Sequence, residues 1–264
     1  MSTYRTAEEG WRALLTGELR EIAERRRIFR FIPTDPRCKI CNAPFHGIGA
    51  PFMRLIGRGQ WPKNPRYCTG CFTFLRSMPG GAEVELSMLF ADVRGSTPLA
   101  ERLGPSAFSK LINRFFSVAS ELVVQSDGVV EKFVGDEVTA LYIPGWAGPQ
   151  HARVAIDTGL RLLRATGHGE RGGPWVPIGI GVHTGTAYVG TVGDAEGVND
   201  FAALGDAANT AARLAGVARE GELLASETAC RAAGLDVLEL EQRDLELKGK
   251  REPVRVRVLR VAPS

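Results

Sequence analysis

Four of the five cysteines have the spacing of a metal site. They form two Cys-x-x-Cys pairs, Cys38 with Cys41 and Cys68 with Cys71. Each pair places two thiolates on one tight turn, so two turns can complete a closed tetrahedral site. In a reducing compartment such pairs hold metal more often than they form disulfides. We predict a structural Zn²⁺ bound by these four cysteines; an iron–sulfur cluster is the alternative, and His46 could replace one ligand.

Two aspartates end strand-like segments. Asp92 follows the apolar run 84–90, and Asp136 lies in a Gly-Asp turn between two short strand-like segments. Either residue alone is typical of an ordinary turn or helix cap. If both segments belong to one sheet, the carboxylates can meet, and Mg²⁺ or Mn²⁺ would relieve their repulsion. The loop Gly95-Ser96-Thr97 could offer backbone N–H groups to a phosphate.

The elements that must position these residues follow from hydrophobic periodicity. Strands and helices alternate as β-α-β-β-α-β with additions, which indicates an α+β fold of helices on a mainly antiparallel sheet, ferredoxin-like in its order. The spacing predicts helices over 7–30, 105–127, 150–166 and 205–218, and strands over 84–90, 129–134, 138–143, 176–182, 186–191 and 254–258.

The chain is expected to divide near residue 80. Residues 1–36 read as a helical segment, 37–79 as the four-cysteine module, and 80–264 as a larger domain. The module is short and poor in periodic apolar residues, so it needs a staple other than a hydrophobic core. Pro79-Gly80-Gly81 has the composition of a linker.

Composition excludes several classes of protein. The chain is 44% hydrophobic and 24% charged, which is typical of folded proteins, and its net charge of +3 does not favour general polyanion binding. Its start lacks a secretion signal, and its apolar runs are shorter than the ~20 residues that span a bilayer. We therefore expect a cytoplasmic protein without membrane contact, in which Arg25–Arg27 form part of a solvated face.

Four stretches, in this order, resemble the class III nucleotide cyclases. Any one stretch would be weak evidence for this resemblance, but four stretches in the same order are specific to the family. The similarity spans roughly residues 84–262. The four-cysteine module lies outside it. The matching stretches are Phe90–Thr97, Lys132–Asp136, Gly179–Gly185 and Gly205–Arg213.

The resemblance implies a cyclase core with two-metal active sites at the head-to-tail interface of a homodimer. Asp92 and Asp136 of one protomer would hold two Mg²⁺ or Mn²⁺ ions, with the Val93 carbonyl as a further ligand. Asn209 of the other protomer would orient the ribose. Arg213 would stabilise charge on the reacting phosphate. These two residues are four apart and share one helix face.

The resemblance also implies how the base and the phosphates are recognised. Lys132 matches the base-reading position of adenylate cyclases. Ala202 stands where the family has Asp or Thr, which accepts a hydrogen bond from the adenine amino group. Alanine offers no acceptor, so Asp200 or a backbone carbonyl would have to substitute. Lys248 matches a lysine that meets the terminal phosphates.

We therefore predict an adenylate cyclase that converts ATP to 3′,5′-cyclic AMP and pyrophosphate. One alternative is a cyclase for a pyrimidine or another nucleotide, and a second is a non-catalytic dimerising module that senses nucleotide. A third is a zinc-ribbon nucleic-acid binder with Arg25–Arg27 as its basic arm, which the near-neutral charge does not favour. The four-cysteine module is expected to be a dimerisation or regulatory element.

Overall fold

The computed structural model describes residues 6–18, 20–32, 36–61, 64–77, 79–193 and 200–263, which belong to two compact units. Unit 1 comprises residues 1–85, 143–149 and 186–204, and unit 2 comprises 86–142, 150–185 and 205–264. Two long strands, β3 (Gly81–Val93) and β6 (Ile178–Val192), contribute residues to both units. The division of the chain near residue 80 stays a prediction.

The main sheet has the strand order β4-β5-β3-β6-β8-β10-β9, and β7 pairs with β6 outside this path. The pair β6–β8 is parallel, whereas β4–β5, β5–β3, β6–β7, β8–β10 and β10–β9 are antiparallel, which confirms the predicted α+β fold. The remaining bounds are β4 (Val129–Val134), β5 (Glu137–Tyr142), β7 (Asp200–Leu204), β8 (Leu223–Ser226), β9 (Glu241–Leu245) and β10 (Val254–Leu259).

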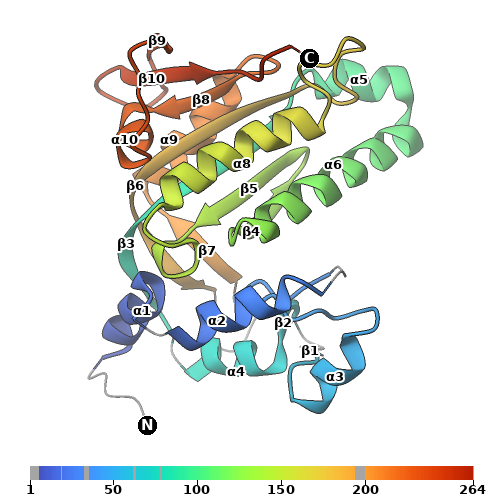
Figure 1. Cartoon of the computed structure of the whole chain (residues 1–264), viewed down its shortest axis with the longest axis vertical. Coiled ribbons are helices and arrows are strands. Elements are labelled where there is room, and N and C mark those ends of the chain that lie inside the picture. Colours follow the sequence, from blue (N-terminus) through green and yellow to red (C-terminus); the bar gives the residue numbers. More distant parts are fainter. Residues whose placement is uncertain are drawn as a thin grey trace. The chain divides into compact units, whose positions relative to one another are not determined.

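Helices of unit 2 cover its strands. Both α6 (Pro105–Gln125) and α8 (His151–Ala165) contact β5 and each other, and Figure 1 shows them side by side over β4 and β5. The helix α9 (Asp206–Val217) packs directly on the backbone of β6. A Cβ atom added at Gly181 would lie 2.3 Å from the Ala215 nitrogen, so glycine is needed for this close approach. The short α10 (Glu227–Ala232) follows β8.

Several elements differ from the sequence-based expectation. The predicted helix 7–30 is two helices, α1 (Ala7–Thr16) and α2 (Arg20–Phe29), because Gly17 adopts a left-handed φ of 91° and ends the first. The strands predicted at 176–182 and 186–191 form the single strand β6. An additional helix, α5 (Ser96–Leu103), begins directly after Gly95.

Unit 1 builds its core around aromatic side chains. Trp11 of α1, Tyr67 and Phe201 are all fully buried. The helix α7 (Pro144–Ala147) meets α1 so closely that a Cβ atom at Gly145 would lie 2.6 Å from the Leu14 carbonyl oxygen. The other elements are α3 (Ala50–Leu55), β1 (Gln60–Trp61), β2 (Asn64–Cys68) and α4 (Thr69–Ser77).

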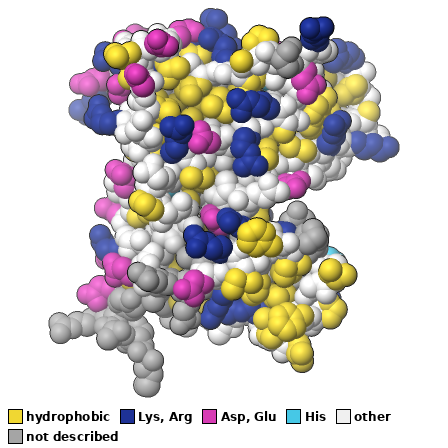
Figure 2. All heavy atoms as spheres, in the orientation of Figure 1, with side chains coloured by type: hydrophobic (Ala, Val, Ile, Leu, Met, Phe, Trp, Pro, Cys, Tyr) yellow, Lys and Arg dark blue, Asp and Glu magenta, His cyan; other side chains and the backbone are white. Residues whose placement is uncertain are grey.

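Part of the surface of unit 1 is apolar. Figure 2 shows hydrophobic side chains gathered on the part of unit 1 that contains α3. Ile48 is 90% exposed, Leu55 83% and Phe52 58%. Among the described residues, no helix combines the length and apolar character that crossing a bilayer requires.

Candidate active site and metal centre

The structure brings the two predicted aspartates to the same end of unit 2's sheet. Asp92 is the penultimate residue of β3, and its cross-strand partner on β5 is Glu137. Asp136 directly precedes Glu137, in the turn that Gly135 makes possible with a φ of 61°. Three acidic residues therefore converge there, of which sequence analysis identified two.

Glu137 is the acidic residue that sequence analysis missed. Burial, together with the charge of Asp136, raises its pKa to about 7, although the nearby Lys132 and Arg94 oppose the shift. The Glu137 carboxyl group therefore lies in the negative potential of Asp136. Glu137 could have been identified from its position opposite Asp92, but that position is known only once the register of β3 against β5 is known.

Arg94 is a second residue to which sequence analysis gave no role. Its guanidinium forms an ion pair with the Asp92 carboxylate. The same guanidinium donates to the Gly216 carbonyl oxygen at 2.9 Å, at the C-terminal end of α9. The Arg94 backbone N–H donates to the Pro177 carbonyl at 2.8 Å. Arg94 thus ties the loop after β3 to the end of α9.

The donors at this end of the sheet fit a hard divalent cation. The side chains of Asp92 and Asp136 are partly exposed and offer carboxylate oxygens, the ligands that Mg²⁺ and Mn²⁺ prefer. Val93, the predicted carbonyl ligand, follows Asp92 and is 3% exposed. Arg94 occupies one side of the Asp92 carboxylate, so a cation bound there would share this carboxylate with the guanidinium or displace it.

The predicted phosphate loop is the start of a helix. Gly95 is the N-cap of α5, with a φ of 62°, and no side chain caps the first turn. The backbone N–H groups of Ser96 and Thr97 therefore belong to an uncapped helix N-terminus, which favours anions. Phosphate binding by Gly95, Ser96 and Thr97 stays a prediction.

Asn209 and Arg213 lie on α9, outside its buried face. Asn209 is exposed and Arg213 is partly buried. The structure places the predicted Lys248 in the loop beside Arg213, because a Cβ atom at the neighbouring Gly249 would lie 3.3 Å from the Arg213 guanidinium. The buried face of α9 consists of Ala207, Thr210, Ala211, Leu214 and Ala215.

The same loop contributes a lysine that sequence analysis did not single out. Lys250 forms an ion pair with Asp206 in the first turn of α9, and this hydrogen bond lowers the pKa of Asp206. Burial and the charge of Lys250 lower the pKa of His183 to about 4. His183 is within 2.8 Å of the Ser226 hydroxyl and is neutral at physiological pH.

The two positions predicted to read the base lie in different units. Lys132 is exposed on β4 of unit 2, where its cross-strand partner is Thr139. Ala202 is half-buried on β7 of unit 1, where its partner is Gly190. The side chain of Asp200, the suggested substitute, lies outside the described residues.

The four predicted cysteines form one cluster in unit 1. Their sulfur atoms all lie within 4.8 Å of one another, and the exposed His46 is not among them. The sulfurs of Cys41 and Cys68 are 3.7 Å apart. A tetrahedron with Zn–S bonds of ~2.3 Å requires separations of about 3.8 Å, so the cluster fits a four-coordinate Zn²⁺. The remaining Cys230 is buried and lies outside the cluster.

Backbone and side-chain donors surround these sulfurs. The N–H of Cys68 donates to the Cys38 sulfur at 3.3 Å, and the N–H of Cys71 donates to the Cys68 sulfur at 3.4 Å. Hydrogen bonds from the other thiols, that of Cys38 first, lower the pKa of Cys68. The Arg58 guanidinium lies 3.9 Å from the Cys68 sulfur and would offset the negative charge of a four-thiolate site.

Arg26 corrects the interpretation of the basic run at 25–27. It is 1% exposed, not solvated, and donates to the carbonyl oxygens of Lys39 (3.1 Å) and Ile40 (2.8 Å). Its guanidinium also lies 5.0 Å from the centre of the Trp146 ring. Arg26 therefore supports the first Cys-x-x-Cys turn and is not available to nucleic acid.

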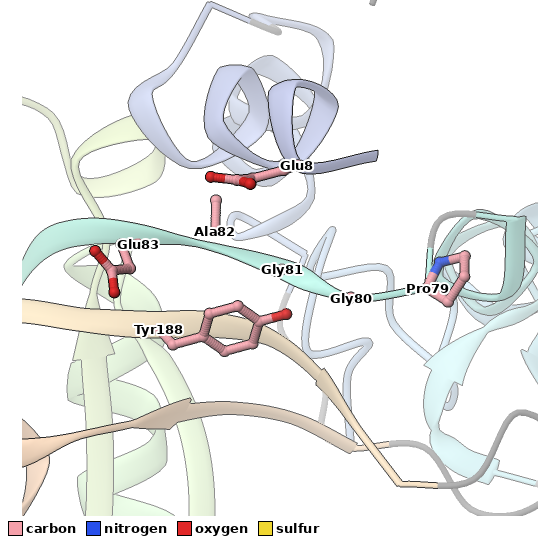
Figure 3. A pocket seen from close by; sticks show the side chains of 7 residues that line it. All are labelled: Glu8, Pro79, Gly80, Gly81, Ala82, Glu83 and Tyr188. Carbon is pink, nitrogen blue, oxygen red and sulfur yellow. The ribbon is translucent and has the colours of Figure 1, made fainter. Parts of the chain in front are cut away.

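A pocket of about 410 Å³ lies elsewhere in unit 1. Figure 3 shows two carboxylates and one phenol around it, and no residue predicted to bind nucleotide or metal lines it. It is therefore separate from the candidate sites. Its lining residues are Glu8, Pro79, Gly80, Gly81, Ala82, Glu83 and Tyr188.

Two curated relatives of this chain are named as adenylate cyclases. An adenylate cyclase from Anabaena cylindrica is 28% identical over 180 residues, 65% of this chain and 36% of the relative. Adenylate cyclase 1 from Rhizobium meliloti is 33% identical over 141 residues, 52% of this chain and 21% of the relative. The chain thus spans about a third or less of these two relatives.

Solved cyclase structures share the fold. The guanylyl cyclase Cya2 aligns with a TM-score of 0.61 and 26% identity, covering 68% of this chain and 93% of Cya2. The adenylyl cyclase CyaB from P. aeruginosa aligns with a TM-score of 0.59 and 27% identity, covering 68% and 95%. The family model for the adenylate and guanylate cyclase catalytic domain matches residues 81–259. The chain therefore belongs to the family of adenylate and guanylate cyclase catalytic domains, the class III nucleotide cyclases.

Proposed function

We propose that the protein is an adenylate cyclase that converts ATP to 3′,5′-cyclic AMP and pyrophosphate. The observation that carries this proposal is the convergence of Asp92 and Asp136 at adjoining ends of β3 and β5, within the segment that matches the cyclase family. Lys132, which matches the base-reading lysine of adenylate cyclases, and the adenylate cyclases among the relatives favour ATP as the substrate.

The reaction needs positioning and charge neutralisation. The ribose 3′-oxygen attacks the α-phosphorus, the bond from that phosphorus to the bridging oxygen breaks, and the 3′-hydroxyl proton passes to solvent as pyrophosphate leaves. Two Mg²⁺ or Mn²⁺ ions at Asp92 and Asp136 would supply the charge that activates the hydroxyl and steadies the triphosphate. We assign no general base, since the neutral His183 is engaged with Ser226.

The residues of this chain supply the remaining contacts. Asn209 would hold the ribose, and Arg213 would stabilise the charge that develops on the α-phosphate. The uncapped N-terminus of α5 would hold phosphate oxygens through its backbone N–H groups. Lys248 would contact the terminal phosphates.

The active form would be a homodimer with two sites. Asn209 and Arg213 lie outside the face of α9 that packs against β6, which leaves both available to a second copy of the chain. In this arrangement one protomer supplies the two aspartates and the other supplies Asn209 and Arg213. The four-cysteine module, residues 37–79, which precedes the proposed catalytic domain 80–264 in the sequence, would hold a structural Zn²⁺ and serve as a dimerisation or regulatory element.

The proposal is tested with purified protein, Mn²⁺ and each of ATP, GTP, CTP and UTP, with products identified by mass spectrometry. We expect cyclic AMP from the wild type and none from Asp92→Ala. Asp157→Ala, which removes an exposed carboxylate paired with Arg153 on α8, is the matched control and should retain activity. A different cyclic nucleotide would overturn the choice of ATP and keep the mechanism. Absence of any cyclic product would contradict the catalytic proposal.

A further inference from the structure

The strand β7, which carries Ala202, depends on contacts outside the main ladder. Among the described residues it pairs only with β6, with Phe201 opposite Thr191 and Ala202 opposite Gly190. A strand with one ladder partner leaves its other row of backbone groups to be satisfied elsewhere. Its position therefore depends on the contacts of that outer edge as well as on its ladder with β6.

A tyrosine of the four-cysteine module makes such a contact. The N–H of Phe201 donates to the Tyr67 hydroxyl oxygen at 2.8 Å, in a buried environment. Tyr67 is 0% exposed and immediately precedes the metal-site residue Cys68. One side chain thus reaches from the cysteine cluster to the backbone of β7.

The Phe201 side chain is enclosed by the same unit. The ring of Trp11 stacks on it with centroids 6.0 Å apart and an interplanar angle of 21°. The ring of Trp146 lies 5.6 Å away at 33°. These contacts hold the side chain of Phe201, while the Tyr67 hydroxyl holds its backbone.

The cysteine cluster fixes Tyr67 on both sides. The carbonyl of the preceding residue, Arg66, accepts from the Lys39 N–H at 3.0 Å, and Lys39 lies inside the first Cys-x-x-Cys turn. The N–H of the following residue, Cys68, donates to the Cys38 sulfur. Both peptide groups that flank Tyr67 are therefore anchored to the other half of the cluster, so a bound metal would hold Tyr67 in place.

Because residue 202 is alanine, recognition of the base would depend on the position of the β7 backbone. Successive residues of a strand point to opposite faces, so Ala202 faces away from the buried ring of Phe201. Because alanine has no hydrogen-bonding side chain, β7 can read a base at this position only through its backbone. A side chain can change rotamer to meet the base, but a backbone group cannot. Recognition of the base by the backbone therefore depends on where β7 lies.

We infer that Tyr67 is a positioning residue that couples the four-cysteine centre to base selection, through its hydrogen bond to the backbone of β7. The inference rests on the proposed function, because it gives Ala202 and its strand the base-reading role. When the centre releases its metal, Tyr67 loses its anchors, β7 loosens, and the enzyme discriminates less between nucleotides.

The test compares full-length Tyr67→Phe with the wild type after metal content and folding have been checked by elemental analysis and circular dichroism. Phenylalanine keeps the ring and removes only the hydroxyl. Tyr142→Phe is the matched control, because Tyr142 is equally buried in unit 2 and its hydroxyl lies 3.3 Å from that of Ser126. Hydrogen–deuterium exchange over 200–204 is measured together with kcat and KM for each nucleotide.

We expect Tyr67→Phe to speed exchange at Phe201 about tenfold and to raise the KM for ATP about fivefold with little change in kcat. The preference for ATP over the other nucleotides should fall by a similar factor. Tyr142→Phe should change neither quantity. Unchanged exchange in Tyr67→Phe, or an equal change in both variants, would overturn the inference.

A second measurement needs no substitution. Titrating the wild-type protein with a zinc chelator should increase exchange over 200–204 in step with metal release, while α6 and α8 keep their protection. Equal loss of protection in all three segments, or none at 200–204, would overturn the coupling. Exchange is measured without substrate, so this result is independent of whether the wild type makes cyclic AMP.

Discussion

Asp92 and Glu137 are direct cross-strand partners at the adjoining ends of β3 and β5. Two acidic side chains opposite each other destabilise a sheet unless a positive charge lies between or beside them. Here Asp136 adds a third carboxyl group, burial raises the pKa of Glu137 to about 7, and Arg94 supplies one compensating charge. The carboxyl groups at this end of the sheet therefore need more positive charge than Arg94 supplies, and the proposed cations would provide it.

Magnesium should stabilise the folded protein. At a concentration about 100 times its Kd, a cation that binds only the native state adds about 2.7 kcal/mol to the free energy of unfolding. We expect Mg²⁺, which does not favour thiol ligands, to raise the thermal midpoint of the wild type and not that of Asp92→Asn. Calorimetry with and without Mg²⁺ measures this, with Asp157→Asn as the control that keeps the shift. A full shift in Asp92→Asn would place the cation elsewhere.

Two inactive variants should restore each other if the site spans a dimer. Asp92→Asn and Arg213→Ala should each lose roughly 1,000-fold in kcat, because each removes several kcal/mol of charge stabilisation. Mixed in equal amounts and allowed to exchange subunits, half of the dimers are heterodimers with one intact site. Activity should recover to about a quarter of the wild-type value. Recovery would be absent if every site were built within a single chain.

The four cysteines should bind about one zinc ion per chain. Cys38→Ser should release the metal and expose residues 37–79 to proteolysis, because the binding energy folds this segment. Cys230→Ser is the matched control: Cys230 is equally buried, with its pKa raised to about 11 by burial, and lies outside the cluster. Elemental analysis and limited proteolysis measure both effects. Metal loss in both variants would contradict the assignment.

Glu222 should contribute a pH-dependent part of the stability. It is 3% exposed; burial alone would raise its pKa, but hydrogen bonds from Arg243 and Arg260 lower it to about 2. Because the folded pKa lies below the ordinary value, the stabilisation is complete above about pH 4.5 and is lost as the pH falls toward 2.

Glu222→Gln should therefore cost about 3 kcal/mol at pH 7 and much less at pH 2.5. Chemical denaturation at the two pH values measures the difference. The exposed i,i+4 pair of Arg153 and Asp157 is the control, and Asp157→Asn should cost about 0.5 kcal/mol or less at pH 7. An equal cost of Glu222→Gln at both pH values would show that the loss is one of packing and not of charge.

Local spacing was sufficient to predict the cysteine cluster and the pair of aspartates. In both cases a short motif fixes the side chains relative to their own turn. Only one contact between two such segments is then needed to bring the four cysteines, or the two aspartates, together. The end of α1 was also present in the sequence as Gly17, but the apolar spacing continued past it and favoured a single helix.

Contacts between distant segments could not be predicted in this way. Phe201 and Tyr67 are 134 positions apart, and nothing in the periodicity of either segment indicates that one donates to the other. Arg26 has the same side chain as its less buried neighbours Arg25 and Arg27, and its burial follows from carbonyl groups that only the folded Cys-x-x-Cys turn presents. Both cases depend on tertiary structure that local pattern does not contain.

The burial of the Phe201 ring by N-terminal residues limits how the segment that matches the family can be transferred to another protein. A chain cut to begin at residue 81 would keep every residue of the family match, yet it would lose Trp11 and Tyr67 and leave a large aromatic ring facing water. Recombination at the family boundary would therefore yield an aggregation-prone fragment. The smallest part of this protein that keeps Phe201 covered therefore includes the N-terminal helix and the cysteine cluster.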